Sequence, residues 1–461
     1  MDKPETQLSI ASNLKIALFH LGSGMADVLT TGVWNRIMIS DLGFAATPIG
    51  LLVSLRYFLA PLGIVAGRFS DRQSVGGYRR LVWIWLGRLM MVLSTIALGY
   101  ATAQLATDVA SASPLMWGLI VISLLLFSTG NAISGSTFLA LIYDRAPESQ
   151  RGRAVGIVWT FLLLGFTVGG IFFGILLPEN TDTTSTLSFA PADLFNLFIM
   201  AAIAFAALWF FSLVGEERRN DIQTLRDNGD HDTSLKSDLK LVWKSRNLRF
   251  FLIYLVGSMF FAFSQDLILE PFAGDVFGME ARITNRFAAY WGSMAIIGSV
   301  LMIWLSRRYP RLTMTLLSQV GTGILLLAFG IFAMSSLAEM RGLVTVGLIV
   351  LGIGLGIWNI GTLGLMMAMS PVGRAGTFLG FWTFVVTLAR GAGVSSGGIF
   401  RDISLGATGS PATSYGLVFV LGVFGLGMSM WALSQVNVKQ FRQNQDTMEF
   451  DTAAVLAGAM D

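Results

Sequence analysis

Apolar segments of roughly 20 residues recur along almost the whole chain and are separated by short polar stretches. A helix needs about 20 apolar residues to cross the hydrocarbon layer of a bilayer, so this pattern predicts an all-α polytopic membrane protein. We predict twelve transmembrane helices, at residues 14–38, 46–67, 81–103, 115–142, 153–177, 193–214, 249–271, 287–306, 311–335, 342–367, 375–400 and 413–435.

One long polar stretch separates the sixth and seventh segments and divides the chain into two halves. Short motifs recur between the halves, because Gly152-Arg153-Ala154 and Trp159-Thr160-Phe161 match Gly373-Arg374-Ala375 and Trp382-Thr383-Phe384. We therefore expect two pseudo-symmetric six-helix bundles, at 1–215 and 248–436, with a linker at 216–247 and a tail at 437–461. The linker is either a solvated connection or a docking surface for a partner.

Arginines concentrate in alternate connections, and this sets the expected orientation. The connections at 67–80, 143–153 and 306–311 each carry at least three arginines, whereas those at 103–114 and 177–192 contain no Lys or Arg. By the positive-inside rule, the arginine-rich connections, the linker and both termini should be cytoplasmic. We expect the first apolar segment to remain as a helix, because it is too long and too polar for a cleavable signal.

The composition narrows the possible chemistry. Of the 461 residues, 54% are hydrophobic and 13% are charged, which excludes an ordinary soluble domain. The chain has no cysteine, which excludes disulfides and thiolate sites, and its two histidines are too few for a His-rich metal centre. It has no GxxxxGK[ST] phosphate loop, so ATP-driven transport by this chain alone is not expected. We expect no enzymatic activity, no bound metal and no nucleic-acid partner.

The arginine-rich connections also carry acidic residues in a pattern that indicates a gate. The stretch from Gly67 to Arg80 resembles the loop 2/3 signature of the major facilitator superfamily, GxxxDRxGRR, and the stretch from Asp144 to Arg153 is similar to its loop 4/5 pattern. The glycine would let helix ends pack closely, and the acidic and basic residues would form a charge latch that opens when the halves rock. The alternative is a basic loop that only sets the topology. The gate candidates are Gly67, Asp71, Arg72, Arg79, Arg80, Asp144, Arg145, Arg151 and Arg153.

A short set of polar residues lies inside the predicted helices. A charge near the bilayer centre costs roughly 2.5–3.5 kcal/mol on insertion scales, so such residues face the bundle interior and pair. The acids could neutralise three of the four arginines, and we expect an ion pair between Arg36 and Glu270. The set is either a polar cluster at a binding site or a group of static ties between helices. Its members are His20, Asp27, Asn35, Arg36, Arg56, Arg88, Asn131, Gln265, Asp266, Glu270, Asn359 and Arg390.

His20 permits two interpretations. A neutral imidazole can ligate the magnesium of a chlorin, but a single histidine in a membrane helix can also simply hydrogen-bond a neighbour.

Two motifs carry a family resemblance. The first helix contains Phe19-His20-Leu21-Gly22-Ser23-Gly24-Met25 and Asn35-Arg36-Ile37-Met38, and the seventh segment contains Gln265-Asp266-Leu267-Ile268-Leu269-Glu270-Pro271-Phe272-Ala273-Gly274. These stretches resemble the helix 1 and helix 7 signatures of the PucC proteins, the bacteriochlorophyll-delivery branch of the major facilitator superfamily. Phe272 and Ala273 stand where that family often has Tyr and Gly, so this chain has no tyrosine hydroxyl at position 272.

The resemblance implies a major facilitator superfamily fold and a role in assembling photosynthetic light-harvesting complexes, by binding or delivering a chlorophyll or bacteriochlorophyll cargo. It implies a bacterial inner, intracytoplasmic or thylakoid membrane, with antenna subunits and pigment-synthesis proteins as partners in the bilayer. It carries over to Asn35, Arg36, Gln265, Asp266 and Glu270 as site residues. The alternative is a secondary transporter of a small solute in which Asp266 and Glu270 are the coupling carboxylates.

Overall fold

The computed structural model describes most of the chain. The described residues are 8–109, 113–147, 150–177, 187, 189–217, 242–243, 245–309, 312–370, 375–441 and 443, and the side chains at 72, 152, 307 and 375–377 are not described. Most of the predicted linker, the tail from 444 onward and the side chain of Arg72 therefore lie outside the described residues.

Within these residues the chain is helical, and twelve helices are long and apolar enough to cross a membrane, as predicted. The first half consists of α1 (Ile10–Val28), η1 (Leu29–Trp34), η2 (Ile37–Asp41), α2 (Ala46–Phe58), α3 (Leu62–Arg72), α4 (Leu81–Thr107), α5 (Pro114–Arg145), α6 (Arg151–Leu176), α7 (Pro191–Ala206) and η5 (Ala207–Phe211). The second half consists of α9 (Arg246–Phe263), α10 (Leu269–Phe277), α11 (Ala281–Thr284), α12 (Phe287–Arg308), α13 (Met314–Leu337), α14 (Gly342–Ala368), α15 (Ala375–Thr408) and α16 (Pro411–Ser434).

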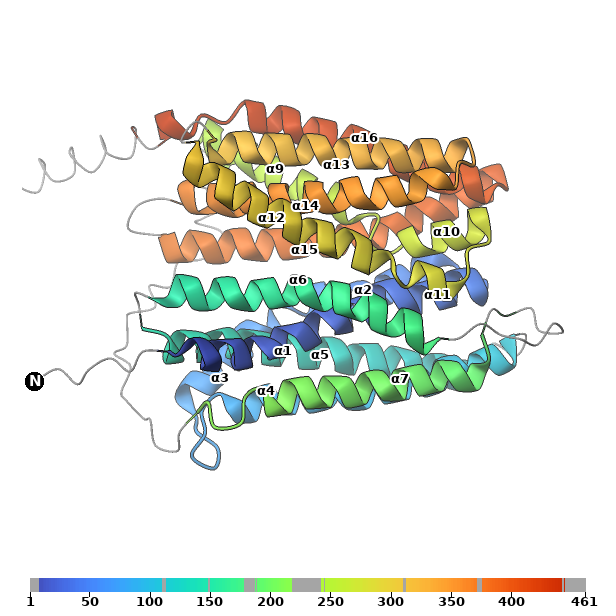
Figure 1. The fold of residues 1–461 in the computed structure, drawn as a ribbon, viewed down its shortest axis with the longest axis horizontal. Helices are drawn as coiled ribbons and strands as arrows, with labels where there is room; N and C mark the ends of the chain where they lie inside the picture. Colours follow the sequence, from blue (N-terminus) through green and yellow to red (C-terminus); the bar gives the residue numbers. More distant parts are fainter. Residues whose placement is uncertain are drawn as a thin grey trace, which may run out of the picture.

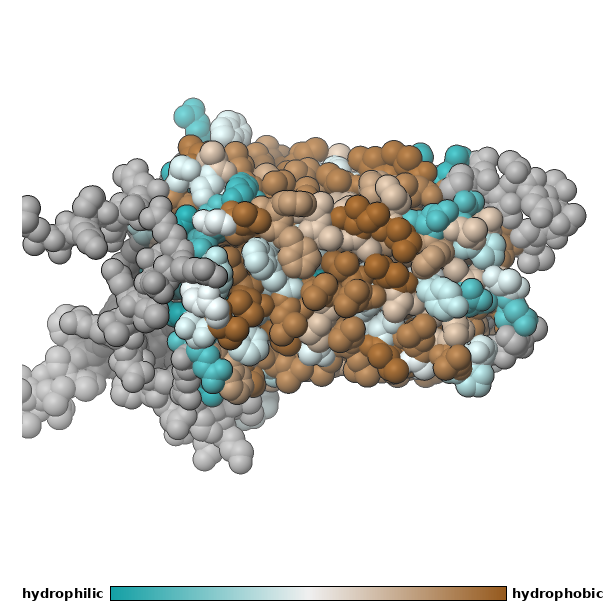
Figure 2. Space-filling model, turned by 90° about the horizontal axis from the view of Figure 1, so that it is seen from below, coloured by the Kyte–Doolittle hydropathy of each residue, from teal (hydrophilic) through white to brown (hydrophobic). Residues whose placement is uncertain are grey.

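The two halves lie side by side with their helices roughly parallel to the long axis of the molecule (Figure 1). They meet mainly where α2 packs against α15 and α6 packs against α12. On the face shown in Figure 2, hydrophobic residues cover the middle and polar residues gather toward the two ends. An apolar band between polar ends is the surface that a bilayer requires, and the molecule is an integral membrane protein.

The seventh span is broken, and the prediction of one continuous helix at 249–271 is wrong. α9 ends at Phe263, a turn follows, and α10 begins at Leu269. Pro271 explains part of the break, because proline has no N–H to donate to the carbonyl four residues earlier, which belongs to Leu267. The freed Leu267 oxygen instead accepts a hydrogen bond from Asn35 Nδ2 at 2.6 Å, so the break in one half is stabilised by the first helix of the other.

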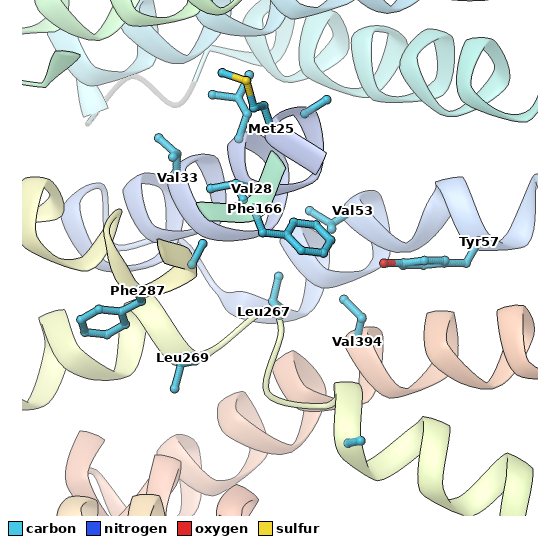
Figure 3. Packing of buried hydrophobic residues seen from close by; sticks show 14 of the residues in the cluster. Met25, Val28, Val33, Val53, Tyr57, Phe166, Leu267, Leu269, Phe287 and Val394 are labelled. Atoms are coloured by element: carbon cyan, nitrogen blue, oxygen red, sulfur yellow. The ribbon is translucent and has the colours of Figure 1, made fainter. Parts of the chain in front are cut away.

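The Leu267 side chain fills the junction of the two halves. Figure 3 shows it between the two helical parts of the span, among buried residues that include Val53 of α2 and Val394 of α15. A Cβ atom at Gly50 or Gly398 would lie only 2.7 or 2.8 Å from Leu267 Cδ2, so both glycines make room for this side chain.

Glycine also brings helix backbones together. A Cβ atom on Gly24 of α1 would clash with the carbonyl oxygen of Leu162 on α6, and one on Gly165 would clash with the carbonyl oxygen of Leu21. A Cβ atom on Gly397 of α15 would clash with the carbonyl oxygen of Ser264, at the start of the break in the seventh span. Small residues allow such close approach between membrane helices, where no hydrophobic force drives association.

Candidate functional site

Two ion pairs face each other at the centre of the molecule, one in each half. In the first half, Arg56 Nη1 lies 2.7 Å from Asp27 Oδ1. In the second half, Arg390 Nη2 lies 3.1 Å from Asp266 Oδ2. The Tyr57 ring lies between them, with the two guanidinium carbons at 4.9 and 5.1 Å from its centroid. The predicted neutralisation of central arginines by acids is therefore confirmed for these two pairs.

A small cavity adjoins these pairs. It is lined by Asp27, Val28, Thr31, Gly32, Phe166, Gln265, Asp266, Glu270, Ala288, Trp291 and Arg390. Its volume of about 20 Å³ holds roughly one water molecule. Ligand sites for drug-sized molecules need about 300–1,000 Å³, so this arrangement of the halves cannot enclose a macrocycle in the cavity.

Glu270 lines the same cavity, and the predicted ion pair between Glu270 and Arg36 is wrong. Arg36 Nη1 instead lies 2.8 Å from Asp41 Oδ2, and its Nη2 donates to the carbonyl oxygen of Met279 at 2.8 Å. η2 is a turn of π-helix, in which residues five apart lie on the same side. It therefore brings Asp41 next to Arg36. Glu270 is 4% exposed, and its Oε2 atom is buried without a hydrogen-bond partner among the described residues.

A polar network near the start of α2 joins the two halves and was not predicted. Arg401 of α15 forms ion pairs with Asp275 of α10 at 2.8 Å and with Asp402 at 3.0 Å. The Asp402 carboxylate also accepts hydrogen bonds from the backbone N–H groups of Ala46 and Thr47, at 3.1 and 2.7 Å. Asp402 thus caps α2 from the opposite half, because the first N–H groups of a helix have no partner within it.

The sequence signal for this network was the pair Arg401-Asp402. It fell past the predicted end of the eleventh helix at 400, whereas the observed helix continues to Thr408.

The gate candidates gather at the end of the first half where α1 begins, and those whose side chains the structure describes make their contacts outside the second half. Arg80 forms ion pairs with Asp71 at 2.6 Å and with Asp144 at 3.0 Å, and Arg79 lies 3.5 Å from Asp71. These contacts join the ends of α3, α4 and α5 within one half. A Cβ atom at Gly67 would meet no atom within 4 Å, so the expected close packing at this glycine is wrong.

The remaining gate candidates contact residues before, within and directly after the helices of the first half. Arg153 donates to the backbone oxygen of Leu8 at 3.0 Å, and the Arg151 guanidinium carbon lies 5.6 Å from the centroid of the Tyr143 ring. Arg145 forms an ion pair at 3.1 Å with Glu216, the first residue of the predicted linker.

Glu216 and Glu217 are both bound to the first half, which composition alone did not reveal. Glu216 is 4% exposed and pairs with Lys15 at 3.0 Å as well as with Arg145. The Glu217 carboxylate accepts hydrogen bonds from the backbone N–H groups of Arg79, Arg80 and Leu81, at 2.6 to 3.0 Å. A carboxylate at this position satisfies the free N–H groups of α4 and interacts favourably with its dipole.

The other candidates from the first half are not among the residues that line the central cavity. His20 is partly exposed, and its ring is stacked 4.9 Å from Phe138 and lies edge-on 6.0 Å from Trp159. Its buried Nδ1 atom has no hydrogen-bond partner in the described ranges. Arg88 is buried, with its guanidinium carbon 4.2 Å from the Phe19 ring centroid and 4.6 Å from that of Trp209. Cation–π contacts of this kind stabilise a buried guanidinium without an acid.

The two asparagines differ in exposure. Asn131 of α5 is partly buried, but Asn359 of α14 is exposed, so its assignment to a buried polar set is wrong. Gln265 Nε2 donates to Asp266 Oδ1 at 2.6 Å, and its buried Oε1 atom has no hydrogen-bond partner within the part of the chain that the structure describes.

The arrangement of twelve helices in two halves defines the structural class. A bacterial homologue of the human lysosomal transporter Spinster, in an inward-facing and occupied conformation, aligns with a TM-score of 0.67 at 15% identity, over 95% of this chain and 99% of its own. At this identity the likeness concerns the fold alone, and the fold is that of the major facilitator superfamily.

The chain belongs to the PUCC protein family, whose model matches residues 33–441. Protein PucC of Rhodovulum sulfidophilum is 30% identical over 405 residues, which are 86% of each chain. The protein named bacteriochlorophyll synthase 44.5 kDa chain, of Rhodobacter capsulatus, is 29% identical over 413 residues, covering 88% of this chain and 90% of its own. The family resemblance predicted from the two motifs is confirmed.

Proposed function

We propose that this protein supports the assembly of photosynthetic light-harvesting complexes by binding or delivering a chlorophyll-type or bacteriochlorophyll-type pigment. The observation that carries the proposal is membership of the PUCC family over most of the chain, together with a relative whose name refers to bacteriochlorophyll. The protein would act in a bacterial inner, intracytoplasmic or thylakoid membrane, with both termini in the cytoplasm. Its partners would be antenna subunits and pigment-synthesis proteins.

The surface and the centre of the molecule fit an apolar cargo. The central arginines Arg56 and Arg390 are already neutralised by acids, and the cavity beside them holds only about one water molecule. The apolar band on the face shown in Figure 2 offers a large surface compatible with a lipid-soluble pigment. In this arrangement of the halves, the pigment would therefore bind outside the central cavity.

A deletion strain tests the proposal. Without this protein, cells should continue to synthesise the pigment but accumulate fewer pigment-loaded antenna complexes, because the missing step lies between synthesis and incorporation. Asp266→Asn should give a partial defect, since it weakens the ion pair with Arg390 that helps position the broken helix. Normal antenna absorption per cell in the deletion strain would refute the proposal.

His20 is the residue that would ligate the central magnesium of the pigment. Trp159 is 48% exposed as a residue, and its ring is tilted by 87° from the imidazole. A macrocycle ligated by an imidazole also stands roughly perpendicular to it, so Trp159 has the tilt that stacking requires. His20→Leu should weaken binding of the magnesium pigment to purified protein but leave binding of its metal-free form unchanged.

The alternative function is secondary transport of a small solute with Asp266 and Glu270 as coupling carboxylates. The observation that favours it is the buried Glu270 Oε2 atom without a partner in the central cavity. Asp266 fits the role less well because it already pairs with Arg390. Loss of uptake of a polar solute in the deletion strain, with normal antenna absorption, would establish this alternative.

A further inference from the structure

A groove lies at the surface of the junction between the halves, where the end of α6 packs beside the start of α12. It is lined by Ile171 and Ile175 of α6 and by Arg286, Ala289 and Tyr290 at the start of α12. Its volume is about 240 Å³, against about 20 Å³ for the central cavity. The groove is therefore large enough to hold part of a ligand, and both halves contribute to it.

The α6 side of the groove is apolar. Ile171 and Ile175 are four residues apart, so they lie on the same face of the helix, and they are 48% and 66% exposed. Both belong to the last turns of the membrane-spanning segment Arg153–Leu176. In a bilayer, an exposed isoleucine pair within such a segment contacts hydrocarbon chains.

The α12 side of the groove is polar and carries a cation. Arg286 and Tyr290 are also four residues apart, and both are exposed. Gly174 lets the arginine lie across the backbone of α6, because a Cβ atom there would be 2.7 Å from Arg286 Cγ and 3.0 Å from its Nε. Arg286 forms no ion pair with any residue that the structure describes. Its positive charge is therefore available to a ligand.

A cation at the edge of an apolar groove matches the two parts of an anionic phospholipid. We propose that the groove binds one phosphatidylglycerol-type lipid, with its phosphate on Arg286 and one acyl chain along Ile171 and Ile175. Guanidinium groups bind phosphate through charge-assisted hydrogen bonds, and basic pockets between transmembrane helices bind lipid headgroups. The Tyr290 hydroxyl is a second donor for the headgroup, as tyrosines are at membrane interfaces.

A lipid in this groove would contact both halves at once. Its phosphate would lie on α12 of the second half and its chain on α6 of the first. The two helices are already in close contact beside the groove, because a Cβ atom on Gly170 would lie 2.6 Å from the backbone nitrogen of Ala289. A ligand that binds one arrangement better than another stabilises it by mass action, so the lipid would favour the contact between the halves seen here. The site is separate from the proposed function, since its ligand is a lipid and not the pigment.

Titration of purified full-length protein with phosphatidylglycerol, followed by native mass spectrometry, tests the site. Arg286→Gln should bind the first lipid about fivefold more weakly than wild type, because one basic residue beside an anionic headgroup is lost. Arg286→Lys keeps the charge and should recover most of the affinity. The matched control is Arg341→Gln, at an exposed arginine between α13 and α14 at the same end of the molecule, and it should bind like wild type (Figure 1). Equal affinity in Arg286→Gln and wild type would overturn the proposal.

Competing ligands decide which molecule the groove takes. Phosphatidylcholine has a phosphate and acyl chains but no net charge, and it should bind several-fold more weakly. Inorganic phosphate should not displace phosphatidylglycerol. Equal binding of phosphatidylcholine, displacement by inorganic phosphate or displacement by the pigment would each overturn the proposal, because the groove would then select another ligand.

The link to the contact between the halves has its own measurement. Phosphatidylglycerol should raise the melting temperature of wild type and of Arg341→Gln more than that of Arg286→Gln. An equal rise in all three proteins would refute this link. The titrations and melts need no pigment, so they can succeed or fail independently of the proposed function.

Discussion

Replacing Asp402 by alanine should shift the protein toward a state in which the two halves separate near the start of α2. The Asp402 carboxylate caps α2 from the other half through two backbone N–H groups, and its side chain is only 20% exposed. Loss of a side chain that caps a helix costs about 1 kcal/mol, with a range of 0.5–2. Loss of an anion near a helix N-terminus costs about 0.3–1 kcal/mol more.

These contributions act only while the halves are in contact, because water satisfies the first N–H groups of α2 once the halves separate. A total of roughly 1–2 kcal/mol corresponds to a change of about 5- to 30-fold in the ratio of closed to open molecules. Asp402→Asn should have a smaller effect, since its amide oxygen can still accept from one of the two backbone N–H groups, although the other hydrogen bond and the charge are lost.

Distances between spin labels would measure this shift. Ala45 and Ala407 are exposed and lie at the facing ends of α2 and α15, and the chain has no cysteine of its own, so a double cysteine variant can be labelled uniquely. We expect a single short distance in the parent and a second, longer distance with Asp402→Ala. The control is Ser410→Ala, which removes the cap of α16 within one half and should lower stability without adding the longer distance. An unchanged distribution in Asp402→Ala, or the same change in the control, would refute the reasoning.

Three other predictions concern stability and topology. Gly24→Ala should destabilise the protein by about 1–3 kcal/mol, because its methyl group has no room against the α6 backbone, whereas Gly330→Ala, where a Cβ atom meets nothing within 4 Å, should be nearly neutral in thermal melts. Glu217→Ala should cost about 1 kcal/mol in the same assay through loss of the cap on α4, and an unchanged melting temperature would contradict that role. Single cysteines at Ser234 and Thr183 should react with impermeant reagents from the cytoplasmic and the opposite side respectively, and the reverse result would show that the arginine distribution was misread.

The helices were predictable because apolar length and charge placement are local properties. Residues such as Asp27 and Asp266 stood out as expensive charges in apolar surroundings, which is why their pairing with arginines could be expected. The sequence did not show which acid would pair with which arginine. Arg36 pairs with Asp41 only because the helix widens between them, and no feature of hydrophobic periodicity encodes that local geometry.

The break in the seventh span and the role of Glu217 depended on residues far apart in the sequence. Pro271 signals a missing hydrogen bond, but the acceptor that it frees is satisfied by Asn35, 232 residues earlier. The sequence pattern assigns Glu217 to the start of a polar linker. No residue near it in the sequence indicates that the beginning of α4 lies beside it. Neither the Asn35 hydrogen bond nor the position of Glu217 beside α4 can be inferred from neighbouring residues in the sequence.

The contact between Gly397 and the carbonyl oxygen of Ser264 has a consequence for how this family can diversify. Asp266 lies two residues beyond Ser264, so a larger side chain at position 397 would displace the broken turn and move a central charge while leaving every charged residue in place. Natural variants could therefore differ in the spacing of their central ion pairs through a position that has no functional group. Comparisons of relatives that align only the acids and bases would judge such variants equivalent when their central geometry is not.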